Sequence, residues 1–153
     1  MFLTYGDLAK LFPHKRGIQL QELFFHTVAT SANTAQYKGI YIPLAEHSGE
    51  LKKAIENGAI AALWDENVEI PLYTPNHFPL FLTNDLLKGL KDMMELYIEK
   101  INATNNKEDE LTNFLFLKES CLKENTSTYD IAVNLEKIAK MNGLLQQGRE
   151  GAK

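Results

Sequence analysis

The sequence predicts an α/β fold: a small mixed or parallel sheet flanked by helices, followed by a C-terminal helical hairpin. The main observation is a strand–helix–strand pattern within residues 38–64. Two apolar runs, residues 39–44 (GIYIPL) and 59–64 (AIAALW), have the composition of buried strands. Between them, apolar residues recur at helical spacing. Because a strand–helix–strand unit favours a right-handed crossover, the two strands are expected to be parallel.

The helix of this unit is predicted to begin after Ser48 and to end at Asn57-Gly58. Serine caps helices through its hydroxyl, and Glu50 would stand in the first turn, where the helix dipole favours negative charge. Glycine tolerates the left-handed conformation that ends many helices.

The N-terminal part predicts one helix and then one or two strands. Thr4 is a suitable cap for a helix that reaches Leu11, and residues 19–29 are rich in apolar side chains typical of strands. A compact basic cluster, residues 14–16 (HKR), lies between them. It has two interpretations: a solvated helix end with cations near the dipole, which is favoured, and an anion site.

A third helix of the domain is expected after a third buried strand. Residues 69–74 contain Pro71 and suit an edge position, residues 80–83 predict the buried strand, and Thr83 or Asn84 would cap a helix reaching about Ile101. Its apolar stripe is typical of a core rather than of a ligand pocket.

These elements divide the chain into three parts. Residues 1–101 are expected to form the α/β domain, residues 102–110 a polar linker, and residues 111–153 a helical hairpin and tail. The hairpin helices are predicted at 110–123 and 129–147, each with an apolar face. Such faces must be covered by this chain, by a second copy in a homodimer, or by a protein partner; docking on the same chain is slightly favoured.

Composition excludes several classes. The net charge is −4 with only two arginines, which disfavours a nucleic-acid partner. The single cysteine, Cys121, excludes an internal disulfide and a multi-cysteine metal site, and a buried or idle thiol is favoured over a nucleophile. No stretch predicts a membrane span, and the first residues lack a basic leader, so we expect no membrane contact and a cytoplasmic location.

The usual catalytic patterns are missing from the sequence. It contains no GxxxxGK[ST] phosphate loop, no GxG dinucleotide turn, no HExxH pair and no GxSxG elbow. The four histidines are scattered singly. We therefore assign no catalytic residue, no metal ligand and no cofactor from the sequence.

Three motifs, in their order, resemble the N-terminal domain of the Mur ligase family, of the MurE and MurF type. Residues 38–44 (KGIYIPL) are similar to the family's first motif strand, residues 54–59 (AIENGA) match its AIxxGA, and residues 80–90 (LFLTNDLLKGL) resemble its later strand and helix start. The resemblance covers roughly residues 1–101. It implies the same fold and a ligand, the UDP part of a UDP-N-acetylmuramoyl-peptide.

The resemblance also implies where this ligand binds. The family's Asp-Ser-Arg falls at residues 30–32 (TSA), where only the serine is kept, and its Asp-Gly-His falls at residues 46–48 (EHS). The ligand-binding residues are then expected to be Thr30, Ser31, Asn33, His47 and Ser48. From the residues alone, the polar run 30–34 predicts a turn more strongly than a ligand site.

Two hypotheses of function follow, and a third, an enzyme of unrecognised type built from residues that folding brings together, ranks below both. The first is a non-catalytic module that binds a UDP-linked cell-wall precursor or a related uridine nucleotide. The second is a regulatory or protein-interaction partner in cell-wall synthesis whose nucleotide site has decayed, because the family's arginine is missing. The family's ATP-binding and C-terminal domains do not follow in this sequence, so ligase activity is not expected.

Overall fold

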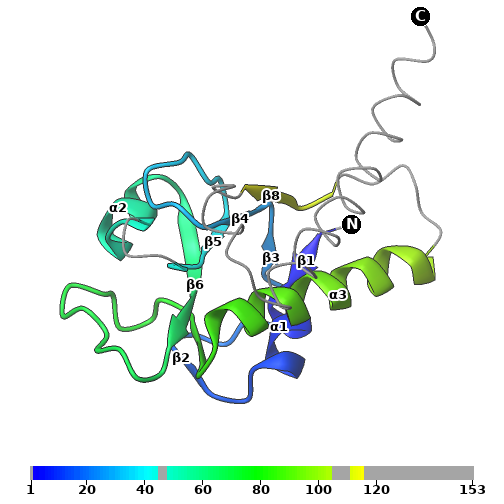
Figure 1. Cartoon of the computed structure of the whole chain (residues 1–153), viewed down its shortest axis with the longest axis horizontal. Helices are drawn as coiled ribbons and strands as arrows, with labels where there is room; N and C mark the ends of the chain where they lie inside the picture. The colour runs from blue at the N-terminus through cyan, green and yellow to red at the C-terminus, as the bar shows by residue number, and fades with distance from the viewer. Residues whose placement is uncertain (1, 45–47, 105–110, 116–153) are drawn as a thin grey trace, which may run out of the picture.

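The computed structural model describes residues 2–44, 48–104 and 111–115 and has the predicted α/β architecture (Figure 1). A six-stranded mixed sheet is flanked by helices, and a two-stranded ribbon lies beside it. The elements are, in chain order, β1 (Leu3–Thr4), α1 (Tyr5–Leu11), β2 (Lys15–Arg16), β3 (Phe24–Phe25), β4 (Thr27–Ala29), β5 (Gly39–Tyr41), α2 (Leu51–Glu56), β6 (Ala59–Asp65), β7 (Leu80–Thr83), α3 (Leu86–Thr104) and β8 (Asn113–Leu115).

The large sheet has the strand order β2-β7-β6-β5-β4-β8. Strands β4 to β7 follow one another as parallel neighbours, which confirms the predicted parallel pair of β5 and β6. Strand β8 returns across the sheet and pairs in parallel with β4, whereas β2 is antiparallel to β7. The direction of progress along the sheet therefore reverses between β4 and β8.

Helices cover both faces of this sheet. On one face, Ile40 and Leu63 belong to a core cluster with residues of α1 and α3. On the other, Tyr41 and Ala62 belong to a cluster with residues of α2. The alternation follows from the two-residue period of strands. Helix α2 connects β5 to β6, in the direction from β4 toward β7, whereas α3 connects β7 back to β8 in the opposite direction. Because both crossovers have the same handedness, the two helices lie on opposite faces of the sheet.

Two of the three helix starts differ from the prediction. Thr4 caps α1 as expected, in a capping box with Asp7. The cap of α3 is Asp85, whose carboxylate accepts a hydrogen bond from the backbone N–H of Lys88 at 3.1 Å, and not Thr83 or Asn84. The predicted cap at Ser48 is also wrong: α2 begins at Leu51 and has no side-chain cap.

Other expectations are corrected by strand pairing. The basic cluster is not a helix end, because residues 15 and 16 form β2 against β7. Residues 69–74 form no strand. The predicted helix at 110–123 is wrong where the structure describes it, because residues 113–115 form β8. The rest of that segment, the helix at 129–147 and Cys121 lie outside the described residues, and the division into three parts stays a prediction.

Thr112 fixes the approach to β8. Its side chain is fully buried, and its hydroxyl accepts a hydrogen bond from the backbone N–H of Leu3 at 2.9 Å and donates one to the carbonyl of Phe25 at 2.7 Å. Its own N–H donates to the Tyr97 hydroxyl at 2.7 Å. One residue thus ties β8 to β1, β3 and α3.

Candidate functional site

The predicted ligand residues lie after the carboxyl ends of β4 and β5. Residues 30–38 connect these two parallel strands, and residues 42–50 lead from β5 to α2. Parallel strands end at the same edge of a sheet, so both connections start there. The backbone N–H of Ala32 donates to the carbonyl of Ser48 at 2.7 Å and joins the two connections. The structure therefore brings Ser31 and Ser48 to one place, as the motifs suggested.

The burial of these residues differs from one to the next. Thr30 and Ser48 have no exposed surface, and Ser31 is 8% exposed, whereas Asn33 is exposed. His47 lies outside the described residues. Asn33 is thus the accessible side chain of the described part of the predicted set, and Thr30 and Ser48 form the interior of the loop.

The polar run forms a turn, as its residues alone predict. The backbone N–H of Asn33 donates to the Ser31 hydroxyl oxygen at 3.3 Å, which is the pattern of a serine turn. The backbone N–H of Thr30 donates to the carbonyl of Leu115 at 3.2 Å. The Ser31 hydroxyl consequently shapes the loop and holds the backbone amide of Asn33 beside it.

Two amide side chains that sequence reasoning missed hold this connection in place. Gln36 is fully buried, and its side-chain nitrogen donates to the carbonyls of Ser31 at 2.9 Å and Thr34 at 3.1 Å. The side-chain nitrogen of Asn57 donates to the backbone carbonyl of Ala32 at 2.7 Å. The backbone carbonyl of Asn57 accepts from the backbone N–H of Gln36 at 2.9 Å. In the sequence, Asn57 gave only the signal of a helix end.

Gly58 allows the close approach of this connection to α2. Its φ is +115°, and a Cβ added there would lie 2.8 Å from the carbonyl oxygen of Gln36. This confirms that Gly58 adopts a conformation with positive φ after the helix, and it adds a steric reason for glycine.

Two tyrosines brace the entry to α2. The Tyr41 hydroxyl donates to the carbonyl of Gly49 at 2.6 Å, and the Tyr73 hydroxyl accepts from the backbone N–H of Lys52 at 3.1 Å. Burial, and then the nearby Tyr73, raise the pKa of Tyr41 to about 12. The Tyr41 phenol therefore stays protonated at physiological pH and acts as a hydrogen-bond donor.

The position of the site in the topology is typical of ligand sites in open α/β sheets. Strand β4 connects onward to β5 on one side, and its other neighbour is β8, the strand at which the direction of progress reverses. Ligands of such sheets bind outside the carboxyl ends of strands at a reversal point. Thr30, whose N–H is bonded to the end of β8, marks this point.

The charges of the described residues limit the chemistry of the site. The arginine of the described part, Arg16, lies on β2, which three strands separate from β4. At about 4.8 Å per strand, that distance is roughly 19 Å. No cluster of three or more His, Cys, Asp or Glu side chains suited to a metal ion occurs in residues 2–44, 48–104 and 111–115.

Comparisons with known proteins add no support to the resemblance to the Mur ligase N-terminal domain, which is based on the sequence motifs alone. No protein-family model matches the chain, and a search of curated proteins finds no match either. Among the helices that the structure describes, none combines the length and the apolar character that crossing a membrane requires.

Proposed function

We propose that this chain is a non-catalytic module that binds a uridine nucleotide, such as a UDP-linked peptidoglycan precursor, at the carboxyl ends of β4 and β5. The observation that supports this most is the 2.7 Å hydrogen bond between Ala32 and Ser48. It joins the two connections on which the family's Asp-Ser-Arg and Asp-Gly-His fall according to the resemblance. Their place beside the reversal of strand order adds a second argument. A cytoplasmic location is part of this proposal.

In the proposed complex, Asn33 makes the direct polar contacts. A side-chain amide offers two donors and an acceptor, which match the alternating carbonyl and N–H groups of a uracil ring. Because Thr30 and Ser48 are fully buried, they support the loop from inside instead of touching the ligand. His47 is the second contact that the motifs propose.

The alternative, a protein-interaction partner, is supported by an aromatic cluster near the amino ends of β4 and β5, opposite to the carboxyl ends where the nucleotide is proposed to bind. Phe2 stacks on His26 with ring centroids 4.2 Å apart, and the Lys38 ammonium lies 4.9 Å from the centroid of the Phe24 ring. Phe24 is 39% and Tyr37 66% exposed. Exposed aromatic side chains are enriched at protein interfaces. This cluster precedes β4 and β5, so a partner there would leave the proposed nucleotide site open.

Titration calorimetry separates the two functions. UDP-N-acetylmuramic acid and UDP should both bind, whereas N-acetylmuramic acid without the nucleotide should not. Asn33→Ala should weaken binding by about 2- to 10-fold, the value of one hydrogen bond, and Ser31→Ala combined with His47→Ala should weaken it further. The matched control is His77→Ala, a histidine on the connection between β6 and β7.

Two results would reject the proposal. If neither UDP compound binds at millimolar concentration, the nucleotide-binding function is rejected and the protein-interaction function remains. ATP-dependent ligation by the purified protein would show that the module is catalytic.

A further inference from the structure

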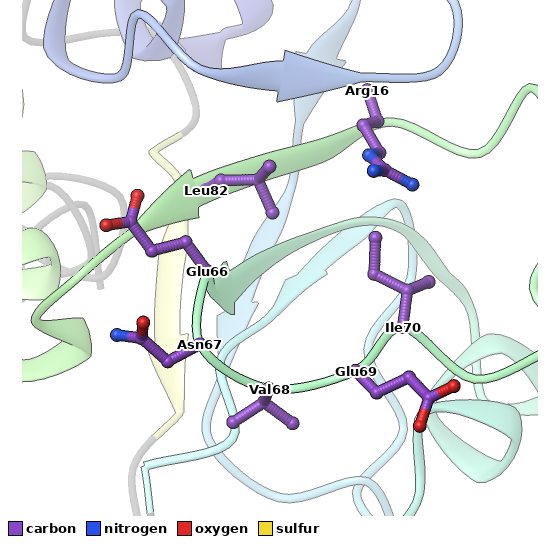
Figure 2. A pocket seen from close by; sticks show the side chains of 7 residues that line it. All are labelled: Arg16, Glu66, Asn67, Val68, Glu69, Ile70 and Leu82. Carbon is purple, nitrogen blue, oxygen red and sulfur yellow. The ribbon is translucent and has the colours of Figure 1, made fainter.

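A cavity lies at the other end of the sheet, beside the edge strand β2. Its volume is about 490 Å³, within the range of about 300 to 1,000 Å³ that is usual for small-molecule pockets (Figure 2). It lies between β2, β7 and the start of the connection from β6 to β7. Its lining residues are Arg16, Glu66, Asn67, Val68, Glu69, Ile70 and Leu82.

Arg16 is the cationic group of this cavity. It pairs with Leu80 across β2 and β7, and Leu80 and Leu82 lie two residues apart, so Arg16 and Leu82 belong to the same face of the sheet. Figure 2 shows its guanidinium directed toward Ile70, with Leu82 on the other side of the cavity. Within the described residues, no ion pair or hydrogen bond occupies this guanidinium. It is therefore available to an anion.

The rest of the lining is apolar at the base and acidic at the rim. Leu82 and Ile70 are partly buried against the core cluster beneath them, and Val68 is 51% exposed. The carboxylates of Glu66 and Glu69 extend away from the middle of the cavity in Figure 2. Two negative charges at the rim oppose a multiply charged anion such as phosphate and tolerate a single negative charge held on Arg16.

The connection that forms one wall is held in shape by its own hydrogen bonds. The indole N–H of Trp64 donates to the carbonyl of Val68 at 3.1 Å. The backbone N–H of Asn67 donates to the Asp65 carboxylate at 2.9 Å, and that of Val68 donates to the Asp65 carbonyl at 3.0 Å. A wall that is already ordered loses little conformational entropy when a ligand binds.

We propose that this cavity binds a monocarboxylate with an apolar body, the carboxylate on Arg16 and the apolar part on Ile70 and Leu82. A guanidinium pairs with a carboxylate through two parallel hydrogen bonds, which a single lysine cannot reproduce. A free branched-chain acid and the C-terminal residue of a peptide both carry this chemistry. The site is independent of the proposed nucleotide site, because Arg16 and Thr30 belong to opposite ends of the sheet.

NMR titration of the ¹⁵N-labelled chain tests this. The probes are 4-methylpentanoate for a free acid and N-acetyl-leucine for a peptide C-terminus, with the corresponding amides and inorganic phosphate as controls. Both acids should shift the amide signals of residues 66–70 with a dissociation constant on the order of 1 mM, as expected for so few ligand atoms. The tighter of the two acids identifies the source. The amides and phosphate should bind at least about ten times more weakly, the loss expected for one charged hydrogen-bonded pair.

Variants on β2 give the matched comparison. Arg16→Gln should weaken binding of both acids at least about tenfold, while Lys15→Gln should leave it unchanged, because Lys15 pairs with Phe81 and belongs to the opposite face of the strand. Arg16 is exposed and Lys15 is partly exposed, and an unchanged spectrum away from the cavity shows that each variant is folded. Equal binding of acid and amide, full binding by Arg16→Gln, tighter binding of phosphate, or no shift with either acid would overturn the proposal.

Discussion

Thr112→Val removes one hydroxyl that serves two buried backbone groups. Valine has nearly the same shape, so the substitution leaves the N–H of Leu3 and the carbonyl of Phe25 without the partners they have at 2.9 and 2.7 Å. Each buried group left unsatisfied costs about 1 to 3 kcal/mol. Valine is more favourable to bury than threonine, so we expect a net loss of about 3 kcal/mol in the free energy of unfolding.

Urea denaturation, monitored by circular dichroism, measures this loss in the free energy of unfolding. Thr112→Ser is the control: it keeps the hydroxyl and removes a methyl group, which should cost only about 1 kcal/mol. The reasoning is refuted if Thr112→Val is as stable as Thr112→Ser. That result would mean that the hydroxyl does not bridge Leu3 and Phe25, and that residues 111–115 are not joined to the sheet as the structure shows.

Two further substitutions test the support of the candidate site. Between pH 10 and 12, the free energy of unfolding should fall by roughly 2 to 3 kcal/mol, at about 1.4 kcal/mol per pKa unit. The reason is that the Tyr41 hydroxyl stays protonated in the fold up to about pH 12, whereas in the unfolded chain it ionises at the ordinary tyrosine pKa of about 10. Its stabilising effect is complete below pH 10, and Tyr41→Phe should flatten this part of a curve of stability against pH; an unchanged slope would contradict the assignment. Gly58→Ala should cost about 2 to 3 kcal/mol from strain at positive φ and the contact with Gln36, whereas the exposed Glu56→Ala should change stability by less than about 0.5 kcal/mol. Equal denaturation midpoints for these two variants would contradict the steric argument.

The sequence predicted those parts of the fold whose signals are local. The apolar runs at residues 59–64 and 80–83 form β6 and β7. The side chain of Thr4 caps the start of α1, and Gly58 follows the end of α2 with a positive φ. These signals need only a few neighbouring residues. They are therefore readable without knowing what packs on them.

The errors occur where a distant partner decides the structure. Leu111, Phe114 and Leu115 have helical spacing, yet residues 113–115 form a strand because β4 offers a free edge. Likewise, Arg16 became part of a strand through its pairing with β7. Long-range pairing of this kind overrides local propensity, and no short stretch of sequence records it.

The candidate site was predictable in place but not in detail. That two connections meet at one edge follows from the parallel strands, which the sequence indicated. The burial of Thr30 and Ser48 depends on the contact of Ala32 with Ser48 and on two amide side chains, Gln36 and Asn57. Gln36 had no signal of its own in the sequence, and Asn57 had only that of a helix end.

The most direct test of the proposed nucleotide site is an NMR titration of the ¹⁵N-labelled chain with UDP. The account predicts saturable shifts of the backbone amides of residues 30–34 and 48–50, with the side-chain amide of Asn33 among the largest, and no shift in β2. Signals that stay unchanged throughout residues 30–50 at millimolar UDP, or shifts confined to other parts of the sheet, would contradict it.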